Sequence, residues 1–574
     1  MVPPTLRFGL TLLCAAVLVP TTHLDAAVAP DAGTIMRDMA DQFQKIPESA
    51  QPTALPQLES DASAVSPSGN ARIMVRRFRI SGATRFPEAQ LLEELRGYTG
   101  RELTLAQLQE ASQSISRFYA RHGYLARTVV PEQDVKDDTV TIQVIESLMG
   151  KVVVVNTDGA RICKGKAASY VTGAQKQGEQ IRFDDLERGL LLLQQTPGVR
   201  SSATVRRGEA AGTSDVMLKL EKEPLLNGSL GYDNYGGRFT GEHRGHASLQ
   251  VNSPLKIGDQ LSLKGMYTDG ITYGRVMYSL PVGSHGLRAG ISLAHLDYTL
   301  GSVYKPLDAT GESNTGGAFV SMPLILKRRS TLQSSFSYEH RHFVDRIFGL
   351  KYGDKTVQCG SIAISGGMFD DLLGGGYTTL GAMISIGDLD LSAIPSVELV
   401  DNAWAKTSGT YEKLSLSMSR VQQLFGPMTR LSLSMAGQIA SKNLDSSEKF
   451  SLGGPNGVRA FPLGEGSGDE GLLLTVELRR VLSGSLQLFS FYDYGTIRRY
   501  ANLTPTIEAG LATPNRYSLS GIGAGVLFMP LQNLSIKGTV ATRVASNPAA
   551  DIYGNDHDGT RREPRFWVEA SYLF

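Results

Sequence analysis

Polar and apolar residues alternate with a period of two along most of this chain. After Leu225, segments such as 414–419 (LSLSMS) and 472–480 (LLLTVELRR) repeat this alternation. Successive side chains of a strand point to opposite faces, so the pattern predicts strands with one apolar and one polar face. About sixteen such segments occupy 225–574, an even number within the range of transmembrane barrels, and we expect no helix in this tract.

The last segment, 565–574 (RFWVEASYLF), suits a strand that closes such a barrel. Closure pairs every backbone N–H and C=O group, which lipid requires. Aromatic residues on its outer face would lie in the belt where a barrel meets the membrane interface. The five residues that share this face are Phe566, Val568, Ala570, Tyr572 and Phe574.

The pattern is mixed between 73 and 222. Residues 73–149 read as strand, helix, helix, strand, strand, and residues 150–222 repeat this order. Two similar units of this size in tandem predict a repeated small α+β domain.

An isolated helix and a linker precede these units. Residues 30–46 carry apolar side chains at one-sided helical spacing, whereas 47–72 holds four prolines among serines and alanines. We therefore predict an amphipathic helix followed by an irregular linker. The apolar face of the helix includes Ile35, Met36, Met39 and Phe43.

Residues 1–29 have the composition of a secretory signal peptide. Arg7 precedes an apolar run from Phe8 to Val19, and small residues follow. This arrangement indicates export, and the run is too short to cross a bilayer as a helix. Export together with the long alternating tract favours a transmembrane β-barrel over a secreted β-solenoid.

Composition limits the partners, metal sites and catalytic motifs that the chain could have. The formal net charge is +1, so nothing points to a nucleic-acid partner. Cys14, Cys163 and Cys359 form no CxxC pair and no metal-ligand spacing, and the nine histidines are scattered. A GxSxG nucleophile motif is absent from the sequence. We therefore expect no catalytic residues, no metal and no cofactor.

One glycine-rich stretch, 453–471 (GGPNGVRAFPLGEGSGDEG), carries a single basic residue, Arg459, among Val458, Ala460 and Phe461. An exposed loop with a solvated arginine would not need apolar neighbours. In the later segment 485–495 (SLQLFSFYDYG), Leu488, Tyr492 and Tyr494 share one face. If that face meets lipid, Asp493 points into the lumen.

Several stretches resemble a known family, the two-partner secretion transporters of the outer membrane (TpsB, or haemolysin secretion/activation proteins). The glycine-rich stretch 453–471 is similar to their long-loop signature Val-Arg-Gly-Tyr/Phe, with Ala460 in place of the glycine. Phe491, Asp493 and Gly495 match a second signature, Phe-x-Asp-x-Gly. The segment 119–135 (YARHGYLARTVVPEQDV) looks like the first POTRA domain of the family, at Gly123, Tyr124, Pro131 and Gln133.

The resemblance implies an all-β, 16-stranded antiparallel transmembrane β-barrel in 225–574, two N-terminal α+β POTRA domains (73–149 and 150–222) and a plug helix (30–46). It implies that the long loop 442–471 folds back into the barrel, where Arg459 meets Asp493. The implied function is an outer-membrane pore whose periplasmic POTRA domains recognise a cognate secreted exoprotein. The pore then passes the exoprotein unfolded to the cell surface without ATP. Further implied partners are outer-membrane lipid and, for its own insertion, the barrel-assembly machinery.

Three alternatives differ in function. A barrel-assembly insertase belongs to the same superfamily, but such proteins typically carry more than the two POTRA units that fit here. An outer-membrane enzyme lacks a supporting motif, and a simple diffusion porin would not need the α+β units.

Overall fold

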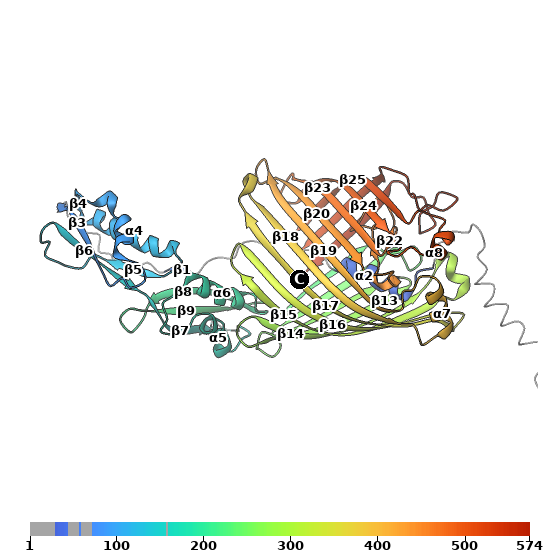
Figure 1. Cartoon of the computed structure of the whole chain (residues 1–574), viewed down its shortest axis with the longest axis horizontal. Coiled ribbons are helices and arrows are strands. Elements are labelled where there is room, and N and C mark those ends of the chain that lie inside the picture. Colours follow the sequence, from blue (N-terminus) through green and yellow to red (C-terminus); the bar gives the residue numbers. More distant parts are fainter. Residues whose placement is uncertain (1–28, 44–56, 59–71, 157–158) are drawn as a thin grey trace, which may run out of the picture.

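The computed structural model describes residues 29–43, 57–58, 72–156 and 159–574. The predicted signal peptide, apart from Ala29, and most of the predicted linker lie outside the described residues. Two small α+β units stand in line at one end of a large β-barrel (Figure 1). Within the described residues, no helix is long and apolar enough to cross a membrane.

Sixteen strands close into an antiparallel barrel, which confirms the predicted fold class. Each strand pairs with its neighbour in the sequence, and β10 pairs with β27 from Ser229–Leu573 to Asp233–Glu569. The first eight strands are β10 (Leu226–Asp233), β11 (Arg244–Asn252), β12 (Gln260–Tyr267), β13 (Ile271–Val282), β14 (Leu287–Thr299), β15 (Thr310–Leu326), β16 (Ser330–Ile347) and β17 (Leu350–Asp370). The others are β18 (Gly376–Asp390), β19 (Gly409–Leu424), β20 (Thr429–Ala440), β23 (Glu470–Val481), β24 (Leu486–Arg498), β25 (Arg516–Leu531), β26 (Leu534–Arg543) and β27 (Arg565–Leu573).

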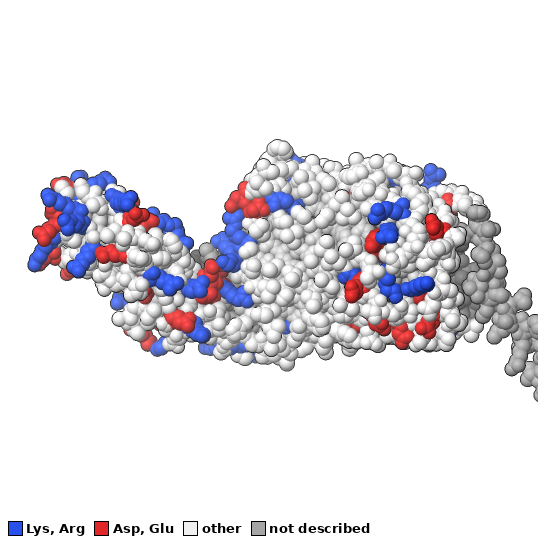
Figure 2. All heavy atoms as spheres, in the orientation of Figure 1, with Lys and Arg blue, Asp and Glu red and all other residues white. Residues whose placement is uncertain are grey.

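The outer face of the barrel is apolar. On β27, Phe566, Val568 and Tyr572 are exposed, whereas Trp567 on the opposite face is buried. Figure 2 shows few charged side chains over the middle of the barrel and many over the α+β units and towards the two barrel ends. An uncharged band between two charged rims is what a bilayer requires of a barrel.

Short helices lie in the connections of the barrel, contrary to the expectation of none. These are α7 (Pro395–Ala403) and α8 (Pro505–Gly510), with the 3-10 turns η2 (Ser302–Leu307), η3 (Leu372–Gly374) and η4 (Ser446–Glu448). Both α-helices begin with proline at the first turn, where its fixed φ suits a helix. They are too short for a helical period to stand out beside the strands.

The first α+β unit packs helices on small sheets. Strand β3 (Arg77–Ser81) lies parallel to β6 (Thr139–Glu146), which pairs antiparallel with β5 (Ala126–Val129). Leu108, Ile115 and Tyr119 of α4 (Leu105–Arg121) are buried against this sheet. The remaining elements are β2 (Arg72–Val75), β4 (Arg101–Thr104), α3 (Glu88–Glu93) and the 3-10 turn η1 (Arg96–Tyr98).

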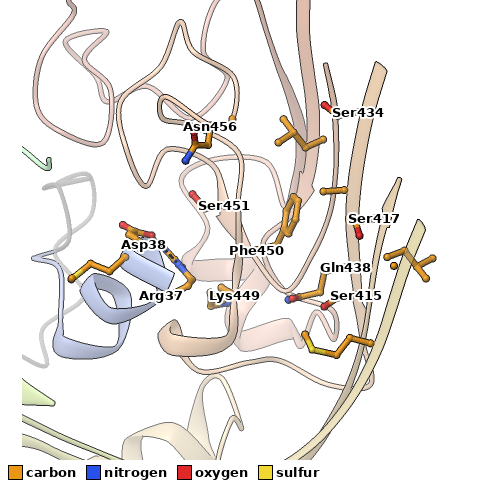
Figure 3. A pocket seen from close by; sticks show the side chains of 18 of the residues that line it. Arg37, Asp38, Ser415, Ser417, Ser434, Gln438, Lys449, Phe450, Ser451 and Asn456 are labelled. Atoms are coloured by element: carbon orange, nitrogen blue, oxygen red, sulfur yellow. Dashed lines mark hydrogen bonds and ion pairs between the residues drawn. The ribbon is translucent and has the colours of Figure 1, made fainter. Parts of the chain in front are cut away.

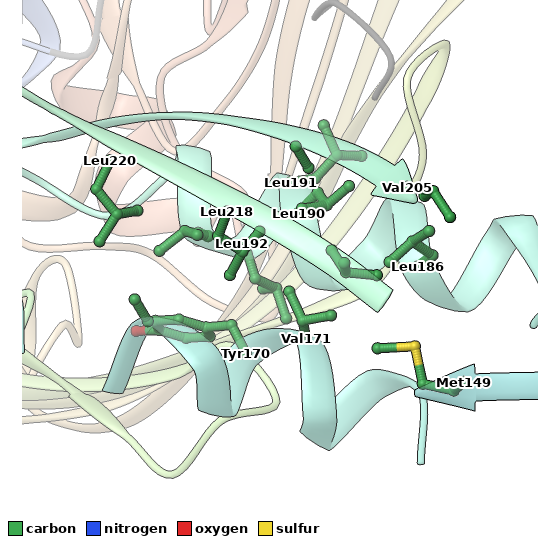
Figure 4. Close-up of a cluster of buried hydrophobic side chains, with 14 of the residues drawn as sticks. Met149, Tyr170, Val171, Leu186, Leu190, Leu191, Leu192, Val205, Leu218 and Leu220 are labelled. Carbon is green, nitrogen blue, oxygen red and sulfur yellow. The ribbon is translucent and has the colours of Figure 1, made fainter. Parts of the chain in front are cut away.

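The second unit repeats the strand, helix, helix, strand, strand order of β3, α3, α4, β5 and β6, without counterparts of β2 and β4 among its described residues. Strand β7 (Leu148–Asn156) spans the predicted 149/150 boundary, and α5 (Lys164–Ala174), α6 (Phe183–Gln194), β8 (Val199–Arg207) and β9 (Thr213–Lys222) follow. Tyr170 and Val171 of α5, Leu190 of α6 and Leu218 of β9 meet in its core (Figure 4). Strand β1 (Gln57–Leu58) pairs in parallel with β8.

The second unit is docked on the short turns at its end of the barrel. Arg161 donates hydrogen bonds to the backbone carbonyls of Ser253 (3.1 Å) and Pro254 (3.2 Å). Arg188 donates to the carbonyl of Pro323 (2.8 Å), and Leu326 of β15 packs in the core of the unit. The α+β units therefore sit at the mouth of the barrel.

Helix α2 (Ala32–Phe43) lies inside the barrel lumen (Figure 1). Ile35 and Met39 are buried in a cluster with Phe343 and Leu444, and Met36 is half-buried. The side chain of Phe43 lies outside the described part of the chain. The one-sided apolar face predicted from the sequence is thus turned towards the barrel wall.

Candidate functional site: a lumen that holds a loop and a helix

The connection between β20 and β23, residues 441–469, folds back into the barrel lumen. It contains η4, β21 (Phe450–Ser451) and β22 (Ser467–Gly468), so Glu470 and Gly471 of the predicted loop 442–471 already belong to β23. Val458 and Phe461 at its tip are fully buried, and Ala460 is 1% exposed. An apolar tip of this kind packs against the wall and does not face solvent.

The structure brings Arg459 and Asp493 into direct contact. The guanidinium donates from Nε to Asp493 Oδ2 (2.9 Å) and from Nη2 to Oδ1 (2.8 Å), and the backbone N–H of Arg459 also donates to Oδ2 (3.1 Å). Such two-pronged, charge-assisted bonds are strong and fix orientation. Asp493 is 0% exposed and Arg459 6%, so water does not compete for either group.

Three further residues complete this contact. Nη1 of Arg459 donates to Glu477 Oε2 (2.9 Å), and its guanidinium carbon lies 3.2 Å from the ring centroid of Phe491. The indole N–H of Trp567 donates to the backbone carbonyl of Arg459 (2.8 Å). Strands β23, β24 and β27 therefore all hold the tip of one loop.

Glycines of the wall let the loop come this close. Ala460 lies against Gly521 of β25, where a Cβ would be 2.7 Å from the Cβ of Ala460. Non-glycine residues with positive φ occur in the described part of the chain, but Ala460 is not one of them. Alanine is accordingly compatible with the backbone here, although the family signature has glycine. Gly495 sits against Leu452 of the loop.

A second group of polar residues anchors the later half of the loop. Glu465 accepts from Asn547 Nδ2 (3.0 Å) and from the backbone N–H of His557 (2.7 Å), both in the connection between β26 and β27. Asn547 Nδ2 also donates to Asp556 (3.0 Å). Burial raises the pKa of Glu465, and burial beside Glu465 raises the pKa of Asp556 to about 6.

Helix α2 is held by polar contacts near its start. Lys355 of β17 bridges Asp31 (2.6 Å) and Asp445 of the loop (2.9 Å). The backbone N–H of Ala32 donates to Asp345 (2.9 Å). Arg37 donates to Ser467 Oγ of the loop (2.8 Å). The helix therefore touches both the wall and the loop.

A cavity of about 1250 Å³ remains in the lumen beside α2 and the loop. Figure 3 shows Arg37 and Asp38 of α2 and Asn456 of the loop on one side, with Ser415, Ser417 and Ser434 on the opposite wall. Among the described residues, no group of acidic, histidine or cysteine side chains has an arrangement that holds a metal ion.

The predicted POTRA residues occupy structural positions. Gly123 ends α4 with φ +85, and its carbonyl accepts from Phe183 N–H of the second unit (2.9 Å). Tyr124 forms a bridge with Arg182. Gln133, next to Pro131 in the turn after β5, exchanges hydrogen bonds with the backbone of Thr141 at 2.7 and 2.8 Å.

Sequence reasoning did not single out Glu477, Trp567 or Glu465. A signal existed for the first two, because the alternation on β23 and β27 places both on the luminal face. Glu465 gave no such signal, since it lies in an irregular loop whose path depends on contacts distant in sequence.

Comparison with known proteins decides the family. Residues 212–526, more than half of the chain, match the family model described as haemolysin secretion/activation protein ShlB/FhaC/HecB, and residues 73–147 match the POTRA domain, ShlB-type. The chain belongs to the ShlB/FhaC/HecB family.

Relatives support this membership over most of the chain. The heme/hemopexin transporter protein HuxB of Haemophilus influenzae is 28% identical over 495 residues, 84% of each chain. The outer membrane transporter CdiB of Dickeya dadantii is 23% identical over 448 residues, 75% of this chain and 76% of CdiB. The solved structure of CdiB from Escherichia coli has a TM-score of 0.67 at 18% identity, covering 96% of this chain and 100% of CdiB.

This ShlB/FhaC/HecB family member is therefore an outer-membrane transporter of the two-partner secretion type, with its POTRA domains in the periplasm. Members of this family are transporters. The docked α+β units mark the periplasmic mouth of the barrel, and the long connections at the other end mark the cell surface.

Proposed function

We propose that this transporter exports one cognate exoprotein, which its two POTRA domains recognise in the periplasm and its barrel passes unfolded to the surface. The observation that carries this proposal is a lumen occupied by a helix and a loop, next to the α+β units at the periplasmic mouth. A permanently open porin would need neither. The periplasm holds no ATP, so folding of the exoprotein outside the cell would supply direction.

We assign 73–149 and 150–222 to the two POTRA domains, 30–46 to the plug helix and 47–72 to the linker between them. The shared order of elements in the two units supports the first assignment. The burial of Ile35 and Met39 inside the lumen supports the second. In this arrangement the linker joins a helix inside the pore to domains outside it.

We assign Arg459 and Asp493 the role of holding the long loop in one conformation. Desolvation offsets much of the attraction in a buried ion pair, so the pair is better suited to specifying a conformation than to adding stability. Removing one partner would leave the other charge buried and unpaired, at a cost of roughly 3–5 kcal/mol.

The test compares the medium and the outer membranes of cells that have the gene, lack it, or carry Arg459→Ala. We expect the gene deletion to remove one large exoprotein from the medium and leave other outer-membrane proteins unchanged. Arg459→Ala should reproduce that loss while the barrel still reaches the membrane. The control is Arg430→Ala, which removes an exposed arginine from the adjacent strand β20.

Two results would contradict this proposal. A broad fall in many outer-membrane barrels on deletion would indicate an insertase. Unchanged media would indicate that the chain exports no exoprotein under the conditions tested.

A further inference from the structure

Several strands on one side of the barrel are longer than a bilayer requires. Strand β16 has 18 residues and β17 has 21. A tilted strand crosses a membrane with about 9–11 residues. On the other side of the barrel, β10 and β12 have 8 residues each and β27 has 9. The long strands therefore continue well beyond the hydrocarbon core of the membrane.

The outward face of the long strands changes from apolar to polar towards the cell surface. Phe336 of β16 pairs with Ile362 of β17, and both side chains are exposed. Further along the same face, His340 pairs with Gln358, and Gln358 pairs with Asp388 of β18. Side chains two residues apart on a strand share a face, so both rows point away from the lumen.

Polar rows continue beyond this point. His295 of β14 pairs with Asn314 of β15, and Asn314 pairs with His342 of β16. The ring of His295 is hydrogen-bonded to Asn314 (2.7 Å) and that of His342 to Asp354 of β17 (2.8 Å). We call the outward side of these rows the outer polar face. Six of its residues are His295, Asn314, His340, His342, Gln358 and Asp388.

The inward side of the same rows is apolar. Leu296, Phe343, Val357 and Leu389 are buried there in one cluster with Ile35 of α2. Nearer the periplasm the same strands turn serines towards the cavity and apolar side chains outwards. Apolar inside and polar outside is the arrangement of a sheet in water, whereas a barrel in lipid has the reverse. The reversal marks the level at which these strands leave the hydrocarbon.

We propose that the outer polar face binds the sugar head group of a glycolipid in the outer leaflet of the outer membrane. The face continues directly from the apolar band that contacts acyl chains, so its occupant stands on the membrane beside the barrel. In a glycolipid the sugars likewise continue from the acyl anchor. The inference goes beyond the proposed function, because it concerns the lipid side of the barrel and not the exported chain.

The chemistry of this face suits sugar hydroxyls better than phosphates. Its cations are already paired, Arg346 with Glu312 and Lys351 with Asp354, each at 2.7 Å. Asp388 adds a further exposed carboxylate. A phosphate would be repelled by these carboxylates, whereas a hydroxyl can donate to them and accept from a ring N–H or an amide.

The spacing of the rows suits a ring with hydroxyls around its edge. Side chains directly opposite each other on neighbouring strands stand about 4.5–5.5 Å apart. One sugar ring can therefore bond to His340 and Gln358 together, and the next ring to His342 and Asn314. Contacts that are weak one by one add up when the sugars are linked to each other and to the membrane.

The test measures how tightly the purified full-length protein binds glycolipid in detergent, by native mass spectrometry. One probe is lipopolysaccharide with a complete core oligosaccharide. The second is deep-rough lipopolysaccharide, which keeps the acyl chains and phosphates but lacks most core sugars. The third is the core oligosaccharide released from its acyl chains.

A triple variant carries His295→Ala, His340→Ala and His342→Ala. The matched control is His243→Ala, because His243 is also exposed at the cell-surface end but stacks on Tyr232 beside β10. The substituted side chains are exposed or half-exposed, so the thermal unfolding temperature of the barrel should stay unchanged.

We expect the triple variant to bind complete lipopolysaccharide at least about tenfold more weakly than the wild type, because three hydrogen-bonding groups are lost. His243→Ala should bind it within about twofold of the wild type. Deep-rough lipopolysaccharide should bind to the wild type and the triple variant alike.

Four results would overturn the proposal. Equal binding of complete lipopolysaccharide by the triple variant and the wild type would show that the face holds no sugars. An equal loss of deep-rough lipopolysaccharide would assign the contact to phosphates or acyl chains. Tighter binding of the released oligosaccharide than of the glycolipid would make a soluble saccharide the ligand. A dimer of the wild type that the triple variant lacks would make a second copy of this chain the occupant.

This assay needs no exoprotein. Its outcome therefore stands whether or not gene deletion removes an exoprotein from the medium, so failure of this inference and failure of the proposed function are distinguishable.

Discussion

The long loop and helix α2 occupy the same lumen, but the protein holds them in different ways. The tip of the loop makes a buried contact in which Arg459 meets Asp493, Glu477 and the ring of Phe491. The helix is held mainly near its start, through Lys355 and Asp345. The loop is continuous with two barrel strands, whereas the helix leads into residues outside the described part of the chain. The difference indicates that the loop is held more firmly than the helix.

The largest effect should come from changing Asp493, the residue of the barrel wall that binds Arg459 of the loop. Asp493 accepts three hydrogen bonds from Arg459 and Glu477 accepts one. Asp493→Asn should therefore destabilise the docked loop by roughly 3–5 kcal/mol, since it leaves the Arg459 charge without its main partner. Protease cleavage of the loop in intact cells measures its release.

Glu477→Gln is the matched variant for this prediction. This change neutralises the second carboxylate that contacts Arg459 but keeps the contact between Arg459 and Asp493. We therefore expect less cleavage than in Asp493→Asn. Equal cleavage in the two variants would show that the loop does not depend on the Asp493 contact in particular.

A somewhat smaller effect should follow from freeing the helix. Lys355→Ala removes the bridge between Asp31 and Asp445 and leaves two carboxylates close together, at a cost of about 3 kcal/mol to the docked helix. The resting conductance should rise, while the thermal unfolding temperature of the barrel stays unchanged. Single-channel recordings in planar bilayers measure the first quantity.

Lys351→Ala provides the control on the same strand. Lys351 pairs with Asp354 at an exposed position, where an ion pair contributes about 0–1 kcal/mol. An increase in conductance as large as that of Lys355→Ala would contradict the role of Lys355 as the anchor of α2.

The smallest effect should be a pH dependence of the loop anchor at Glu465 and Asp556. Burial and, after it, the repulsion of Glu465 raise the pKa of Asp556 to about 6, although Asn547, Arg543 and Arg565 act to lower it. A carboxyl whose pKa is raised in the folded state stabilises that state at low pH and loses this stabilisation as pH rises from about 4 to about 6. We expect the loop to be docked more firmly near pH 4.5 than at pH 7, by up to about 2 kcal/mol.

Loop cleavage measured across this pH range checks the prediction. Asp556→Asn removes the titrating group, so it should flatten the profile at the low-cleavage level. An unchanged slope in that variant would assign the pH dependence to another group.

Much of this arrangement can be predicted from the sequence, because it follows from local periodicity. Alternation predicts the strands, and the same alternation turns Asp493 inwards between Tyr492 and Tyr494. The one-sided spacing of Ile35 and Met39 predicts the helix. Each of these features is determined by residues within a few positions of each other.

The rest depends on contacts between distant residues. Trp567 meets Arg459 across 108 positions, and Lys355 meets Asp31 across 324, so no local pattern predicts either contact. Helices α7 and α8 were missed because two turns in a surface connection do not produce a clear period. The packing of the loop against β24 and β25 could not be predicted, because it depends on the path of the loop through the closed barrel.

The most direct test of the account measures two distances in one protein. Spin labels at Ser417→Cys of β19 and Asp38→Cys measure the distance from the barrel wall to α2. A second variant, with labels at Ser417→Cys and Asn456→Cys, measures the distance from the wall to the loop. Electron paramagnetic resonance would compare each distance before and after addition of the N-terminal part of the exoprotein that gene deletion identifies. We expect the distance to Asp38→Cys to lengthen and the distance to Asn456→Cys to stay the same. A lengthened distance to the loop with α2 still in place would contradict it.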